Sequence, residues 1–107
     1  MTAIAKLRHR LTLEAPEDEP DGAGGVVRVW NSLGQVWAAI EPLGANEAVR
    51  ADKRVGALSH RIVLRHRDGL DLNHRFRLGT RVFTPRTLRD RDERGRYLEC
   101  IAGEERP

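Results

Sequence analysis

The feature that most constrains the fold is an alternation of apolar and charged residues with a period of two. It is clearest in HRIVLRHRDG, residues 60–69, where Ile62 and Leu64 alternate with Arg61 and Arg65. Successive side chains of a β-strand point to opposite faces, so this spacing predicts a strand with one apolar and one cationic face. The cationic face could contact a nucleic acid, an acidic partner protein or only water, and which of these it meets is the main question that the sequence raises.

The same alternation recurs along the chain and predicts about six or seven short strands, separated by turn residues such as Asp68-Gly69 and Gly79-Thr80. The sequence therefore predicts a mainly β fold, a small antiparallel barrel or sandwich, with residues 1–107 forming one domain. Pro85 removes one ladder donor and predicts a sheet edge or a bulge at its position. The expected strands cover residues 7–15, 26–30, 35–42, 60–67, 75–78, 81–88 and 96–103, with NSLG, residues 31–34, read as a turn.

Two segments depart from this pattern. Residues 16–25, PEDEPDGAGG, contain two prolines, three glycines and four acids, which predicts a long flexible loop near the N-terminus. Residues 44–59 instead place apolar side chains three and four positions apart, which predicts one short helix. The apolar residues of that helix are Ala48, Ala51, Val55 and Leu58.

The apolar stripe of residues 44–59 is too small to hold the helix firmly on its own barrel. We therefore expect this segment to engage a partner, with its charged side chains forming pairs across the joint. A helix that simply plugs one end of its own barrel is the alternative. The charged side chains concerned are Glu47, Arg50, Lys53 and Arg54.

Positive charge is concentrated in one part of the chain. The net charge is +3, yet residues 61–96 contain eleven arginines against five acids. A stand-alone basic β-barrel that binds nucleic acid is therefore the alternative function, although such barrels also use exposed aromatic residues on which bases stack. This part of the chain has few, and Phe76 shares its parity with the apolar Leu78, which places it in the core. A solvated arginine-rich face explains the charge equally well.

No catalytic, metal or cofactor site is predicted. His60 and His66 would lie about 20 Å apart on a strand, too far for one metal ion. Cys100 is the single cysteine and shares its parity with Leu98 and Ala102, so we expect a buried, unreactive thiol. A carboxylate pair such as Asp90 and Asp92 could serve a hydrolase or nuclease, but a solvated turn is the simpler interpretation. We expect the protein not to be an enzyme.

Neither a membrane span nor a signal peptide is predicted. No segment approaches the roughly 20 consecutive apolar residues that a spanning helix needs, and the first residues contain no long apolar run. One cysteine cannot form an internal disulfide, which favours a reducing compartment such as the cytoplasm.

The order of these pieces resembles the phage head-tail joining proteins, the small head-completion or stopper subunits of long-tailed phages and gene transfer agents. The resemblance covers nearly the whole chain, and its specificity lies in the order and spacing of the pieces. One departure is Arg65-His66-Arg67, where relatives tend to have an aromatic residue beside the arginine. The matching stretches are LRHRLTLE, VWAAIEPLGANE, HRIVLRHRDGL and RFRLGTRVFTPRTLRDRDERGRYLEC.

This resemblance implies a structural connector with no catalysis. It implies a homo-oligomeric ring, sixfold or twelvefold, with a portal and adaptor ring above it and a tail terminator or tail tube protein below. Such a ring would close the DNA-filled head and dock the tail. The chain would then be part of a virion or phage-like particle, after assembly in the cytoplasm of the producing bacterial cell.

Within such a ring, we expect the arginines of HRIVLRHRDG to face neighbouring subunits or acidic surfaces of adjacent rings. A head-to-tail interface needs one edge of the subunit to complement the other in charge. Non-specific contact with DNA in the channel is a second role for the same side chains. The candidate interface residues are Glu47, Arg50, Lys53, Arg54, Arg61, Arg65, Arg67, Arg89 and Arg91.

Overall fold

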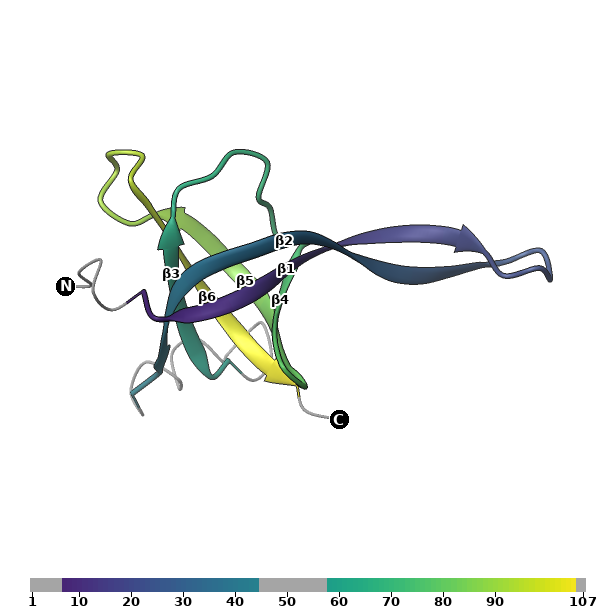
Figure 1. Ribbon diagram of the computed structural model, residues 1–107, viewed down its shortest axis with the longest axis horizontal. Helices are drawn as coiled ribbons and strands as arrows, with labels where there is room; N and C mark the ends of the chain where they lie inside the picture. The colour runs from purple at the N-terminus through teal and green to yellow at the C-terminus, as the bar shows by residue number, and fades with distance from the viewer. Residues whose placement is uncertain (1–6, 45–57, 106–107) are drawn as a thin grey trace.

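The computed structural model describes residues 7–44 and 58–105, which form six antiparallel strands closed into a barrel (Figure 1). The order around the barrel is β1-β2-β3-β6-β5-β4, so β1 pairs with both β2 and β4. The prediction of a mainly β fold, a small antiparallel barrel or sandwich, is confirmed, and of the two architectures the protein forms the barrel. The strands are β1 (His9–Pro20), β2 (Val26–Pro42), β3 (His60–Arg65), β4 (Arg75–Leu78), β5 (Arg81–Asp90) and β6 (Tyr97–Glu105).

No helix occurs in residues 7–44 or 58–105, so no helix there could span a membrane. The helix predicted over residues 44–59 falls mainly on residues 45–57, which lie outside the described residues. Gly44, Leu58 and Ser59 flank that segment and are not helical, and β3 begins at His60.

The barrel interior is filled by the apolar positions that the period of two predicted. Ile62 and Leu64 of β3 are fully buried there, as are Cys100 and Ala102 of β6. The two phenylalanines are the largest fully buried side chains, which confirms the core placement of Phe76. The other buried members of this core are Leu11, Leu13, Ala38, Phe83, Leu98, Cys100 and Ala102.

Pro85 lies at a bulge in β5. The β5–β6 register shifts between Pro85 and Thr87, so Arg86 has no partner in the β5–β6 pairing. The backbone N–H of Ile101 donates to the Thr87 hydroxyl at 3.3 Å at this irregularity. Because a closed barrel has no free edge, the bulge is how this barrel accommodates a proline.

The prediction that residues 16–25 form a long flexible loop is wrong. β1 and β2 both continue past the barrel as a two-stranded ribbon, paired from Ala15–Asn31 out to Pro20–Val26, which we call the arm (Figure 1). Only residues 21–25 form its turn. Prolines are compatible with this ribbon because both of its strands are edge strands, where an N–H facing away from the partner is dispensable.

The turn predicted at NSLG is also wrong, because β2 runs through it without a break. Leu13 pairs with Gly34 and Glu14 with Ser32, so Leu33 is an extra residue that forms a β-bulge. Gly34 has φ 111°, a conformation that side-chain-bearing residues rarely adopt. The bulge lies where the arm leaves the barrel and leaves Leu33 exposed.

The arm is closed at its tip by Asp21. The Asp21 carboxylate accepts the backbone N–H groups of Ala23 and Gly25 at 2.7 and 3.0 Å, and these bonds lower its pKa below the ordinary value. Gly22 and Gly24 both have positive φ, so the Asp-Gly pair of the sequence is a hairpin turn rather than part of a loop.

Cys100 provides a direct test of the barrel interior. Burial raises the pKa of its thiol to about 12, with the Glu99 carboxylate contributing, and only the thiolate reacts with disulfide reagents. We expect negligible labelling of the native protein at pH 8 and complete labelling in denaturant. Since the folded state holds this proton more tightly, the contribution of Cys100 to stability is full below pH 9 and falls between about pH 9 and 12. Rapid labelling of native protein at pH 8 would contradict the core assignment.

Candidate assembly interface

Arginines on the barrel converge on three buried carboxylates, which are Glu14, Glu99 and Glu104. Each carboxylate joins side chains from different strands. A buried carboxylate is tolerated only when it is paired and hydrogen-bonded, and the arginines supply both the charge and the donors. The arginines are therefore part of what holds the barrel together.

Glu99 on β6 is at the centre of the largest group. Arg89 donates from Nε to its Oε2 at 3.1 Å, and Arg91 donates from Nη1 to its Oε1 at 3.2 Å. Arg61 of β3 lies on the other side, with Nε 3.6 Å from Oε1. One carboxylate thus links β3, β6 and the end of β5.

Glu14 fixes the root of the arm. Arg75 of β4 donates to its Oε1 at 2.6 Å, and Arg77 approaches Oε2 at 3.4 Å. The same Arg75 guanidinium lies over the Trp30 ring of the arm, 4.1 Å from the ring centroid. Since Arg75 binds the barrel and the arm together, it defines the direction in which the arm leaves the barrel.

Glu104 closes one end of the barrel. It accepts a bidentate pair from Arg81, at 2.8 and 3.1 Å, and this contact raises the pKa of Arg81. The Arg81 guanidinium lies 5.0 Å from the centroid of the Phe83 ring, and the His60 ring meets Phe83 edge-on at 5.3 Å. These polar groups therefore cover one of the two phenylalanines of the core rather than forming an open site.

The basic part of the sequence is thus largely neutralised within the chain. Of the eleven arginines between residues 61 and 96, seven pair with a carboxylate: Arg61, Arg75, Arg77, Arg81, Arg89, Arg91 and Arg96. Among residues 7–44 and 58–105, the side chains of Arg65, Arg67, Arg86 and Arg94 have no carboxylate partner. These four are the arginines of this part that remain available for contacts outside the subunit.

The structure brings together three of the candidate interface residues, Arg61, Arg89 and Arg91, around Glu99. Arg65 ends β3 and Arg67 follows it, and both side chains are exposed. The remaining candidates lie outside the described residues, so their role stays a prediction. They are Glu47, Arg50, Lys53 and Arg54.

The sequence reasoning missed the arm and the carboxylates that hold the arginines. A signal for the arm was present: the Asp21-Gly22 turn pair stands shortly before the β-rich VVRVW, as in a hairpin, although the residues before it, PEDEP, show no alternation. The carboxylate pairs carry no comparable signal, because they join residues as distant in sequence as Glu14 and Arg77, whose register only the closed barrel defines.

Asp90 and Asp92 organise the loop between β5 and β6. Asp90 accepts the Gly95 N–H at 2.6 Å, and Asp92 accepts Arg96 at 2.6 Å and the Arg94 N–H at 3.1 Å. Arg96 lowers the pKa of Asp92. These contacts match a turn stabilised by its own side chains, in which Asp90 Oδ1 is buried without a hydrogen-bond partner, and no group of three or more metal-ligating side chains occurs in the part of the chain that the structure describes.

Comparison with known proteins finds one matching family and two similar structures. The family model described as phage head completion protein matches residues 2–106. A chain in the virion of a native gene transfer agent particle is 30% identical, with 94% of each chain covered and a TM-score of 0.67. The solution structure of a Shigella flexneri 2a protein has a TM-score of 0.74 at 24% identity over 96% of each chain, which supports the fold alone. No curated protein matches.

The group around Glu99 can be tested through stability. Glu99→Gln preserves the size of the side chain but removes the charge that neutralises Arg61, Arg89 and Arg91. We expect a loss of about 2–3 kcal/mol in the free energy of unfolding, measured by urea denaturation, because Arg89 and Arg91 lose the carboxylate that they bind and Arg61 loses one of its contacts. Glu93→Gln is the matched control, since Glu93 is exposed in the β5–β6 loop, and it should change stability by less than about 0.5 kcal/mol. Equal effects in the two variants would contradict this role of Glu99.

Proposed function

The chain belongs to the phage head completion protein family, whose members are structural head-tail connectors, and on that premise we propose that it forms a ring that closes the DNA-filled head and docks the tail. It is a component of a phage-like particle. The observation that carries the proposal is the match over residues 2–106, supported by the 30% identity to a chain of a gene transfer agent virion. In the ring, the subunit acts as a stopper.

The ring itself is the finer part of the proposal. We propose a ring of sixfold or twelvefold symmetry. It would contact a portal and adaptor ring above it and a tail terminator or tail tube protein below it. The closed barrel suits this position, because its six described strands leave no unpaired sheet edge apart from the arm. Subunits would accumulate in the cytoplasm of the producing bacterial cell and join the head there.

A stand-alone nucleic-acid-binding barrel is not favoured. Seven of the eleven arginines that motivated it pair with carboxylates. Phe76 and Phe83 are fully buried, and Tyr97 packs against a small cluster on the outside of the barrel, so these aromatic residues offer no row of stacking platforms. Contact with DNA in the channel is then a secondary, non-specific property of the unpaired arginines.

Removal of the chain from its particle tests this function. Deleting the coding sequence in producing cells should yield heads without attached tails, because the joint between them is missing. Electron microscopy and density-gradient fractions of the particles measure the outcome, and a plasmid copy of the wild-type chain should restore tailed particles. Normal numbers of tailed, DNA-filled particles after deletion would rule out the connector role.

A further inference from the structure

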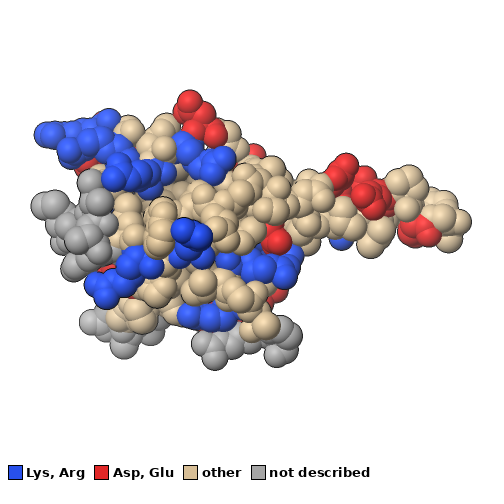
Figure 2. Space-filling view, in the orientation of Figure 1, with Lys and Arg blue, Asp and Glu red and all other residues tan. Residues whose placement is uncertain are grey.

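The acidic and basic parts of the molecule lie at opposite ends. Residues 15–31, the arm, contain four acids and the single cation Arg28. Figure 2 shows acidic side chains along the arm and a cluster of basic side chains at the corner of the barrel farthest from it. The longest extent of the molecule is 50 Å, against 29 and 26 Å for the others, so the two charges are separated along the longest axis.

The two faces of the arm differ in chemistry. Directly paired residues of an antiparallel ribbon share a face, which places Glu17 with Val29 and Glu19 with Val27. We call these four residues the acidic face. On the opposite face the charge is neutralised, because Arg28 and Asp18 pair at 3.3 Å.

The arm is not a stable unit on its own. A two-stranded ribbon in water is marginal, and this one exposes Val27 at 47% while holding two glutamates that have no cationic partner among the described residues on the same face as its valines. The glutamates are not neutralised within the ribbon, although Asn31 donates a hydrogen bond to Glu17. Its root, in contrast, is fixed by Arg75 and Trp30. The acidic face is therefore held out from the barrel in a defined direction, roughly 20 Å long at about 3.3 Å per residue.

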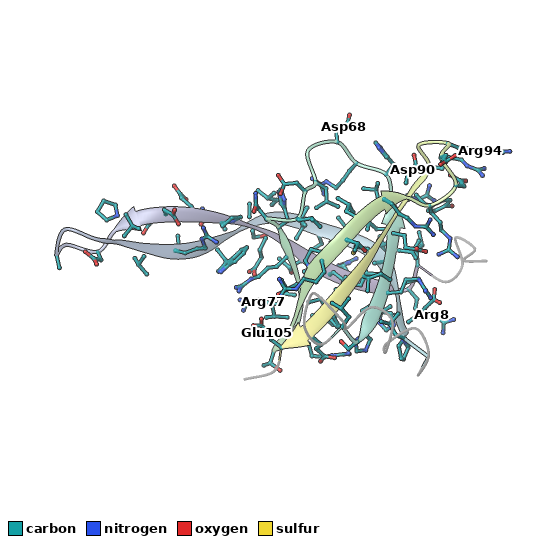
Figure 3. All side chains as sticks on the ribbon, turned by 180° about the vertical axis from the view of Figure 1, so that it is seen from behind. Arg8, Asp68, Arg77, Asp90, Arg94 and Glu105 are labelled. Atoms are coloured by element: carbon teal, nitrogen blue, oxygen red, sulfur yellow. The ribbon has the colours of Figure 1, made fainter. Side chains whose placement is uncertain are left out.

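At the corner of the barrel farthest from the arm, a hydrogen bond joins two basic loops. The backbone N–H of His66 donates to the Arg96 carbonyl at 2.9 Å, which joins the end of β3 to the β5–β6 loop. We call Arg65, Arg67 and Arg94 the basic end. Within the described ranges none of the three side chains has a carboxylate partner, and Arg94 lies at the end of the barrel away from the arm (Figure 3).

We propose that the acidic face of one subunit's arm docks on the basic end of a second copy of this chain, an inference that rests on the proposed ring. A single chain cannot make this contact, because the two surfaces lie at its opposite ends. The surfaces complement each other in charge, and a contact between different patches of identical subunits repeats head to tail and closes into a ring when the rotation allows it. Val27 and Val29 would be covered at the same time.

Charge exchange tests the contact in producing cells that carry variants in place of the natural chain. Glu19→Lys and Arg94→Glu should each lower the yield of tailed particles about tenfold, because each creates a like-charge contact across the joint. The double variant should recover most of the yield, since the pair is restored with its signs exchanged. Glu105→Lys makes the same charge change beside Arg28 and Trp30, on the side of the arm opposite the acidic face, and should behave as the wild type. A double variant as defective as either single variant would overturn the proposal.

Photo-cross-linking in purified particles identifies the partner. A photoreactive residue at position 27 should give a product of twice the chain mass, with the cross-link mapped by mass spectrometry to the segments containing the basic end. Cross-linking to a different particle protein would overturn the inference while leaving the connector role intact. Tailed particles in the absence of the chain would instead remove the connector role itself, so the two failures are distinct.

Discussion

The barrel depends on carboxylates that hold arginines from neighbouring strands. The seam between β1 and β4 consists of only three paired positions, from Thr12–Arg77 to Glu14–Arg75, and Glu14 reinforces it with two arginines. Glu99 joins β3, β6 and β5 in the same way, and Glu104 joins β5 to β6 at the barrel end. With a core of mainly aliphatic side chains and two phenylalanines, the charged layer outside the core is a substantial part of what defines the fold.

The pairing of arginines with carboxylates changes how the basic residues 61–96 are interpreted. An excess of arginine suggests nucleic acid when only composition is considered, but seven of the eleven arginines in residues 61–96 face carboxylates of the same chain. Three of the four arginines left over, Arg65, Arg67 and Arg94, lie at one end of the barrel, and four acids lie at the other, on an arm whose root Arg75 fixes. A subunit with opposite charges at its two ends is suited to join copies of itself, as a connector ring requires.

The sequence predicted the strands well where one face of a strand is buried, because a period of two then appears directly in the residue types. Ile62, Leu64, Leu98 and Cys100 all lie in the predicted core. It failed for residues 16–25 because prolines, glycines and acids are typical both of loops and of an exposed ribbon that buries neither face. At Leu33 it failed because a bulge and a turn use the same residues. The pairing of Glu99 with three arginines depends on the registry of strands distant in sequence, which alternation alone does not define.

The most direct measurement is a cryo-electron microscopy map of the head-tail junction in purified particles, at a resolution that traces individual strands. This account predicts a closed ring of copies of this chain between head and tail, in which each barrel retains the arginines around Glu99 and extends its arm to the adjacent barrel. A junction without a ring of this chain would contradict it.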